Sequence, residues 1–457
     1  MSAIGAVMKK VLLFYPSFMG ENTDPPLYTD IPLSVVTLAG NLHGKYEIEI
    51  LDERIKPQAS NLEEKLKDTL AVGISTTTSY QIINGLQFAK KVRDFDSNIK
   101  IIWGGWHPSL MPYETIQHEL VDIIILGQGE IIFEKLINCL YSSGDLNSVP
   151  NIIYKSRDMQ VVRTARMEFP DLQMPGSMLD GYRYINMKDY IHKGWGNDKV
   201  LGYEASRGCT FACQFCSINA VFQRKWYGLP AQNIFNDIRY LKQKYDVNAI
   251  HFFDNNFFVE KRRVFALAQL MKEDKIEVRW DGTVVVKQFL NFTEKEIDVL
   301  KQSGFYRIIA GIESGDEEVL GNINKRHKNE EVLEVIRRCK AYGILPSLSF
   351  MVGFPWNPEK DTLNTIKLIE QIKNIHHDTE VLLFIFSPYL GTPLYEIAKD
   401  YDMVFPDNLK GWSEFTYDKT NTPWISEKLK RRINRYLSFF GTKEMTESQQ
   451  LFFEKFE

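Results

Sequence analysis

Cysteine is scarce in this chain, at five of 457 residues. So few thiols exclude a disulfide-dense secreted scaffold and favour a reducing compartment. Basic charge is not in excess either, because 55 Lys and Arg face 59 Asp and Glu and the net charge is −4. A broad positive field for nucleic-acid phosphates is therefore missing. No stretch reaches the ~18 apolar residues of a membrane-spanning helix. We expect a soluble, cytoplasmic protein with no nucleic-acid partner.

The remaining composition is ordinary, with 44% hydrophobic and 25% charged residues. At roughly 100–200 residues per domain, the length predicts two or three domains. Near the N-terminus, Lys9 and Lys10 precede an apolar run of only five residues, 11–15. Such a short run indicates a buried first strand rather than a signal peptide.

Residues 1–150 alternate short apolar runs with amphipathic segments. Continuous apolar strands joined by helices predict a doubly wound, Rossmann-like (flavodoxin-like) parallel sheet. Ligands of such sheets lie beyond the carboxyl ends of the strands. Small or special residues stand at these ends: Thr76, Thr77, Gly104, Gly105, Trp106, Gly127 and Glu130. We expect a bound cofactor at this edge.

The rest of the chain divides into three regions. Residues 151–199 show little periodicity and contain Pro170 and Pro175, so they are predicted to form a connector. Residues 200–400 contain six strand–helix units, which predict a partial (β/α)6 barrel with its chemistry at the carboxyl rim. Residues 401–457 are irregular at first and helical from Glu427 onward.

A cysteine loop follows the first strand of the predicted barrel. Cys209, Cys213 and Cys216 form a CxxxCxxC pattern, whereas Cys139 and Cys339 stand alone. Structural zinc needs four protein ligands, so a zinc site would require a histidine from elsewhere in the chain. An iron–sulfur cluster held by three thiolates fits this loop better and leaves one iron open for a small molecule.

This loop resembles the signature of the radical S-adenosylmethionine (SAM) superfamily. The run from Ser206 to Cys216 is close to the form found in the cobalamin-associated branch. The resemblance implies that a 4Fe-4S cluster binds SAM and splits its carbon–sulfur bond. The products are methionine and a 5′-deoxyadenosyl radical, which removes a hydrogen atom from a substrate. The three cysteines would be the cluster ligands and the catalytic centre.

Further residues at the strand ends match this family. The resemblance implies contacts with SAM for Phe215, Asp254, Asn255, Glu313, Ser314 and Gly353. Asn255 stands where the family pattern has a second acidic residue, so charge pairing with the SAM ammonium would fall to Asp254.

The N-terminal region resembles the cobalamin-binding domain of the same branch, through residues 104–108 and 127–130. The usual D-x-H-x-x-G loop after the first strand is replaced by the run from Tyr15 to Gly20, which has no histidine. We expect cobalt to receive no histidine from this loop. His43 and His107 remain conceivable ligands.

The resemblance implies a cobalamin-dependent C-methyltransferase acting on an unactivated carbon of a small natural product, a lipid or a peptide. An external electron donor such as flavodoxin or ferredoxin would reduce the cluster. Alternatives are a radical SAM cyclase, oxidase or rearrangement enzyme without methyl transfer, and a non-catalytic iron–sulfur protein. A tRNA methylthiotransferase fits less well, because that family carries additional upstream cysteines.

Overall fold

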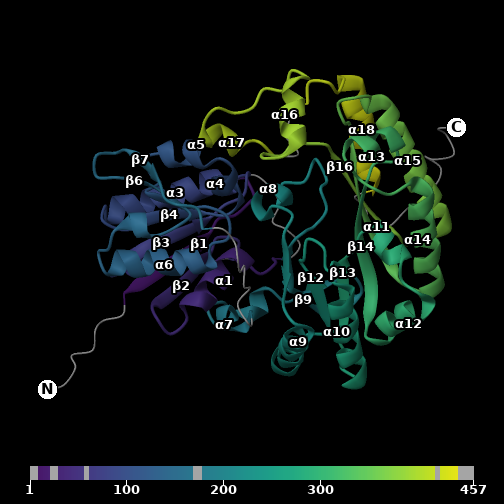
Figure 1. Ribbon diagram of the computed structural model, residues 1–457, viewed down its shortest axis with the longest axis horizontal. Coiled ribbons are helices and arrows are strands. Elements are labelled where there is room, and N and C mark those ends of the chain that lie inside the picture. Colours follow the sequence, from purple (N-terminus) through teal and green to yellow (C-terminus); the bar gives the residue numbers. More distant parts are fainter. Residues whose placement is uncertain (1–8, 21–28, 56–60, 168–177, 417–421, 441–457) are drawn as a thin grey trace. The chain divides into compact units, whose positions relative to one another are not determined.

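The computed structural model describes residues 9–20, 29–55, 61–167, 178–416 and 422–440. The chain divides into two compact units (Figure 1). Unit 1 comprises Met1–Ser206, Ala220–Ile250 and Phe405–Lys419, and unit 2 comprises Arg207–Asn219, His251–Val404 and Thr420–Glu457. Each unit is described by itself below.

Unit 1 is built on a seven-stranded sheet with the order β2-β1-β3-β4-β5-β6-β7. Its strands are β1 (Lys10–Tyr15), β2 (Glu47–Asp52), β3 (Thr69–Ser75), β4 (Lys100–Gly104), β5 (Ile123–Ile125), β6 (Ile152–Lys155) and β7 (Val161–Arg163). The first five strands in the chain run parallel, and Val11 to Phe14 of the central β1 are buried on both faces, as a sheet covered by helices requires.

Helices lie on both sides of this sheet (Figure 1). They include α1 (Leu33–Leu42), α2 (Leu62–Leu66), α3 (Gln81–Phe95), α4 (Trp106–Leu110), α5 (Pro112–Gln117) and α6 (Glu130–Tyr141). Three helices follow later in the chain: α7 (Leu179–Tyr182), which contacts α1, α8 (Ile218–Phe222), and α9 (Ala231–Tyr245), whose Asp237 accepts a 2.8 Å hydrogen bond from Tyr203. The 3-10 turns η1 (Leu146–Ser148) and η2 (Met187–Asp189) follow α6 and α7, respectively.

The predicted doubly wound sheet is confirmed, with one addition. Strands β6 and β7 extend it in the antiparallel sense, inside the region where the sequence indicated only a connector. These strands are four and three residues long, which is too short for a periodic pattern to stand out.

The second large sheet has the order β16-β15-β14-β13-β12-β9-β8. Its strands are β8 (His192–Gly194), β9 (Asn197–Tyr203), β12 (Ala249–Phe252), β13 (Arg279–Thr283), β14 (Phe305–Glu313), β15 (Leu345–Val352) and β16 (Glu380–Ile385). Strands β13 to β16 run parallel, and β8 pairs with β9 in the antiparallel sense. A separate two-stranded sheet joins β10 (Ser206–Gly208) and β11 (Trp226–Gly228).

The helices of unit 2 alternate with these strands, so the predicted partial barrel is confirmed. They are α10 (Lys261–Glu273), α11 (Val286–Leu290), α12 (Glu294–Gln302), α13 (Glu317–Asn322), α14 (Asn329–Tyr342), α15 (Pro358–Ile375), α16 (Pro393–Lys399) and α18 (Glu427–Phe440). Local signals explain several boundaries. Thr293 and Glu296 form a capping box at the start of α12, and α14 stops at Gly343, whose φ is +59°.

The C-terminal region is shared between the two units. Its short helix α17 (Leu409–Trp412) belongs to unit 1, where the ring of buried Trp412 lies 6.0 Å from that of His107. The indole Nε1 of Trp412 donates a 2.8 Å hydrogen bond to Glu114. Helix α18 belongs to unit 2 and contacts β16. None of the described helices combines the length and apolar character that crossing a bilayer requires.

Candidate cofactor sites

The cysteine loop begins at Gly208, whose φ of +80° suits glycine best. The Gly208 amide donates to the side-chain oxygen of Asn255 at 3.1 Å. Asn255, the departure from the family pattern, therefore ties the start of the loop to the end of β12. An aspartate there would accept the same bond, so the backbone geometry does not need the charge.

Backbone contacts hold the middle of the loop against two later segments of unit 2. The Gln214 amide donates to the Ile323 carbonyl at 3.0 Å, and the Leu394 amide donates to the Gln214 carbonyl at 3.3 Å. The side-chain amide of Asn324 donates to the Ala212 carbonyl at 2.8 Å. The loop is therefore anchored by its own backbone, which leaves its thiols available as ligands.

The three thiols of this loop are half-buried, whereas Cys139 and Cys339 are buried in helices α6 and α14. Burial raises the pKa of the Cys213 thiol and brings that of Cys216 to about 11. Cluster binding would therefore release protons from the loop. In the described ranges, no three His, Cys, Asp or Glu side chains already converge on one point. The donor set fits a three-thiolate cluster, because the loop offers three accessible sulfurs and no competing ligand.

Beside this loop lies an ion pair that is largely buried. The Lys325 ammonium is 2.8 Å from the Glu313 carboxylate, and these side chains are only 12% and 9% exposed. Burial lowers the pKa of Lys325, but Glu313 and the nearby thiols outweigh burial and raise it, so the ammonium stays charged. The Lys325 Nζ also lies 5.8 Å from the centre of the Phe215 ring. The arrangement gathers an anion, a cation and an aromatic face next to the thiols.

Two backbone features make room for this pair. A side chain at Gly311 would collide with the Glu313 carboxylate. Glu313 itself has a φ of +72°, a left-handed conformation that costs of order 1–3 kcal/mol for a residue with a side chain. Strain of this kind is kept where the surrounding structure demands a particular side-chain direction.

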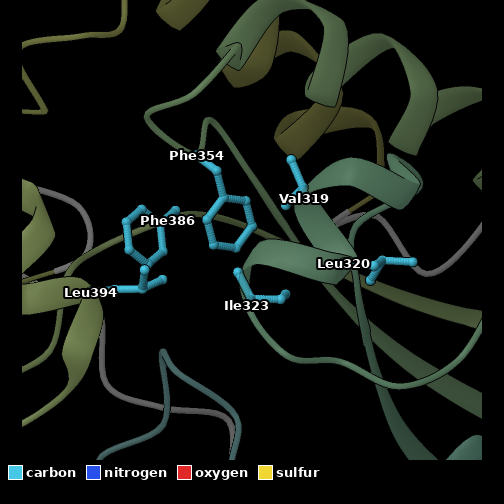
Figure 2. Packing of buried hydrophobic residues seen from close by; sticks show 6 residues of the cluster. All are labelled: Val319, Leu320, Ile323, Phe354, Phe386 and Leu394. Atoms are coloured by element: carbon cyan, nitrogen blue, oxygen red, sulfur yellow. The ribbon is translucent and has the colours of Figure 1, made fainter.

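Phe215 packs against a hydrophobic cluster formed by Val319, Leu320, Ile323, Phe354, Phe386 and Leu394. Figure 2 shows these six side chains gathered between the end of α13 and the turn after β15. The Phe354 and Phe386 rings stack with centroids 4.5 Å apart. Trp424, from the segment before α18, packs on the same cluster. The cysteine loop is thus fixed to the ends of three strands of unit 2.

The other predicted SAM contacts lie at strand ends of the same unit. Ser314 follows β14, and its hydroxyl donates to Asp361 at 2.6 Å. Gly353 follows β15 with a φ of +85°, and its amide donates to the same carboxylate at 2.8 Å. Asp254 follows β12 and is buried, with its carboxylate 3.8 Å from the Arg263 guanidinium. Part of the Asp254 charge is therefore balanced within the protein.

In a second charged cluster of unit 2, acidic and basic side chains pair with one another. Asp281 of β13 accepts from His251 Nδ1 at 2.8 Å and from the Arg307 guanidinium at 2.8 Å. Arg307 also reaches Glu380 at 2.9 Å and Ser347 at 3.1 Å. Because the charges pair across four strands, we assign this network to the stability of the sheet.

The predicted cobalamin residues gather at the carboxyl ends of β3, β4 and β5 in unit 1. Gly105 has a φ of +95°, and an added Cβ would lie 2.6 Å from the Thr76 carbonyl. An added Cβ at Gly104 would meet nothing within 4 Å, so this point faces open space. The buried Thr76 Oγ1 and Gln128 Nε2 have no hydrogen-bond partner in the described structure. Open space beside unsatisfied polar atoms fits a bound polar cofactor.

The remaining predicted residues of this edge have partners within unit 1. Thr77 pairs with Gln81 at 2.9 Å. Trp106 opens α4, and its ring lies 5.9 Å from that of Phe222. Gly127 has a φ of +74°, and buried Glu130 starts α6. Both features shape the turn after β5.

Each conceivable histidine ligand has a hydrogen-bond partner for its Nδ1. His43 Nδ1 lies 2.7 Å from the Tyr184 hydroxyl, and His107 Nδ1 lies 2.9 Å from the Thr78 hydroxyl. His107 is fully buried, and burial lowers its pKa to about 3. Both rings are therefore held within unit 1 through Nδ1, whereas the buried Nε2 of His107 has no hydrogen-bond partner in the described structure.

Comparison with known proteins identifies both regions. The family model "Radical SAM superfamily" matches residues 203–369, and "B12 binding domain" matches residues 27–137. The chain belongs to the radical SAM enzymes that carry a cobalamin-binding domain. Its cofactors are a 4Fe-4S cluster, SAM and cobalamin.

Curated relatives share about a quarter of their residues with this chain. An uncharacterized methyltransferase, PH0819 from Pyrococcus horikoshii, is 24% identical over 421 residues, covering 90% of this chain and 88% of the relative. An anaerobic magnesium-protoporphyrin IX monomethyl ester cyclase from Synechocystis is 24% identical over 413 residues, covering 88% of this chain and 79% of the relative.

Two solved structures share the fold. The radical SAM methyltransferase TsrM from Kitasatospora setae, with cobalamin and a 4Fe-4S cluster bound, has a TM-score of 0.68 at 16% identity over 87% of this chain and 76% of that chain. The cobalamin-dependent S-adenosylmethionine radical enzyme OxsB, with aqua-cobalamin bound, has a TM-score of 0.70 at 16% identity over 94% of this chain and 67% of that chain. At this identity the likeness extends to the fold alone.

The sequence did not point to Lys325, Asp361 or Trp424. Lys325 is part of a Lys-Arg pair that reads as ordinary surface charge, and Asp361 reads as an acidic residue in the first turn of a helix. Only their contacts with Glu313, Ser314 and Gly353 connect them with the site.

Proposed function

We propose that this protein is a cobalamin-dependent radical SAM methyltransferase that methylates an unactivated carbon of a small natural product, a lipid or a peptide. The observation that carries the proposal is the presence in one chain of a three-cysteine loop and a glycine-lined sheet edge with unsatisfied polar atoms. Methyltransferases among the relatives and TsrM among the structures of this fold support it.

In this proposal Cys209, Cys213 and Cys216 ligate the cluster. When bound, the cofactors supply the radical chemistry and the methyl group, and the protein supplies binding and orientation. The charged Lys325 ammonium suits a carboxylate of SAM, and Glu313 suits its ammonium or hydroxyl groups. The hydrophobic cluster behind Phe215 keeps water away from one side of this site.

The remaining predicted contacts are assigned in the same way. Ser314, Gly353, Asp254 and Asn255 would shape the SAM site from the strand ends of unit 2. For cobalamin we propose the edge formed by Thr76, Thr77, Gly104, Gly105, Trp106, Gly127 and Glu130. No histidine lies between Tyr15 and Gly20, so this loop supplies no imidazole to cobalt.

The proposal is tested by anaerobic reconstitution with iron, sulfide and hydroxocobalamin, followed by counting both metals per chain. We expect about four irons and about one cobalt. Replacing Cys213 with alanine should abolish 5′-deoxyadenosine formation, whereas the matched variant Cys139→Ala, at an isolated helix position, should retain it. Deoxyadenosine formation by Cys213→Ala would refute the cluster assignment.

The magnesium-protoporphyrin cyclase relative supports a second candidate, a radical SAM reaction without methyl transfer. The two candidates differ in the mass of the product. A substrate that gains one methylene identifies a methyltransferase. Deoxyadenosine and an altered product that has gained no methylene favour the second candidate.

Cluster reduction requires an electron from outside, and we propose an acidic donor protein of the flavodoxin or ferredoxin kind. Helix α18 offers a surface for it. Its buried residues Leu429 and Ile433 face unit 2, while Lys428, Arg431 and Arg435 are exposed, with no carboxylate partner in the described structure. With Leu429 and Ile433 already buried, the described part of this helix suits an acidic protein better than a membrane.

Charge reversal tests this surface. An Arg431→Glu/Arg435→Glu variant should slow turnover driven by reduced flavodoxin several-fold at low salt, because charge complementarity mainly sets the association rate. Turnover driven by dithionite should not change. Equal rates with flavodoxin would contradict the docking surface. A reducing, cytoplasmic location suits such a donor and the free cysteines.

A further inference from the structure

Asp361 occupies the first turn of α15 and is fully buried. A buried carboxylate is costly unless several donors surround it. Burial raises the pKa of this carboxyl to about 6, against the opposing effect of its hydrogen bonds. The protein therefore maintains an expensive group at a position where an apolar side chain would pack at lower cost.

The donors to Asp361 come from two different turns. Its Oδ1 accepts from the Ser314 hydroxyl at 2.6 Å, and its Oδ2 accepts from the amides of Gly353 at 2.8 Å and Phe354 at 3.3 Å. Ser314 follows β14 and Gly353 follows β15. One carboxylate thus joins the ends of two adjacent strands of unit 2.

Each turn is also held from its other side. The Gly315 amide donates to Thr365, one helical turn beyond Asp361, at 2.8 Å. The Trp424 indole donates to the Gly353 carbonyl at 2.9 Å, and an added Cβ at Gly353 would collide with Ile425. Both backbone polar groups of Gly353 are therefore hydrogen-bonded inside the protein, and reorienting the turn would break these bonds.

We propose that Asp361 is a positioning residue for SAM, which locks the turns after β14 and β15 into one rigid cradle. The inference rests on the proposed function only in naming SAM as the ligand. Asp361 is itself buried behind the turns, so it acts through Ser314 and Gly353. A merely structural carboxylate would stabilise unit 2 and leave the affinity of folded protein for SAM unchanged.

The test compares Asp361→Asn with Glu359→Gln, which removes an exposed carboxylate from the same helix turn. An asparagine side chain cannot accept from both turns at once, because its NH2 group is a donor. We expect the KM for SAM in deoxyadenosine formation to rise about tenfold while kcat at saturating SAM stays within about threefold. Iron content should match the wild type, and Glu359→Gln should behave as wild type.

An unchanged KM in Asp361→Asn with full iron content would overturn the inference. Asp361→Ser, a smaller replacement that leaves space for water, is measured in parallel in case the asparagine variant does not fold. Loss of the cluster in both variants would also overturn it, because Asp361 would then maintain the barrel as a whole. Trp424→Phe, which removes one donor and keeps the ring, should raise KM by a smaller factor.

Failure of the proposed function gives a different result. In that case the wild type forms no deoxyadenosine. Equilibrium dialysis of SAM against reconstituted wild type and Asp361→Asn still tests the cradle, through the ratio of the two dissociation constants.

Discussion

Replacing Lys325 with methionine should destabilise unit 2 strongly, because it leaves the Glu313 carboxylate with little water and no cation. The two side chains are 12% and 9% exposed and lie 2.8 Å apart. Breaking a buried pair by removing one partner costs about 3–5 kcal/mol. For a domain of roughly 150–250 residues, each kcal/mol lowers Tm by about 2–4 °C. The expected decrease is therefore roughly 6–20 °C.

The measurement is scanning calorimetry of the metal-free protein, so that loss of the cluster does not contribute. The control is the double variant Glu313→Gln/Lys325→Met, in which both charges are removed. Because a neutral pair of similar volume carries no uncompensated charge, the double variant should recover more than half of the lost Tm. The reasoning is refuted if Lys325→Met lowers Tm by less than about 2 °C, or if the double variant is no more stable than the single one.

Two further predictions concern unit 1. Gly105→Ala should lower both stability and cobalamin content, since its Cβ would lie 2.6 Å from the Thr76 carbonyl. Gly104→Ala should lower cobalamin content alone, because its Cβ would enter only the open space proposed for the cofactor. Calorimetry measures the change in stability, and cobalt counting measures the change in cobalamin content. Acid should destabilise this unit through His107, whose pKa is about 3 in the folded protein and roughly 6.5 in the unfolded chain. Because the unfolded state then binds more protons, the free energy of unfolding decreases as the pH falls below about 6.5. At pH 5 the loss is about 2 kcal/mol, and His107→Phe should lose correspondingly less between pH 7 and pH 5; equal losses in both proteins would contradict this assignment.

Much of the architecture follows from local pattern. The buried run in β1 and the alternation of strands with amphipathic helices predict both sheets, because apolar periodicity records which faces are covered. The short strands β6 and β7 escaped prediction, since a strand of three or four residues carries too little periodic signal. The hydrogen bond from Trp412 to Glu114 joins positions 298 residues apart, and neither local sequence predicts it.

The sequence by itself determined the chemistry that this protein can host. The short spacing of the three cysteines predicts a ligand loop, and glycines at positions 208 and 353 permit turns whose positive φ few other residues can adopt. Only the tertiary structure decided which groups support that chemistry. Lys325 comes back to Glu313 after the short helix α13. Asp361 joins Ser314 to Gly353 because the adjacent parallel strands β14 and β15 bring their carboxyl ends together. A buried charge is defined by its partners, and those partners exist only after the chain has folded.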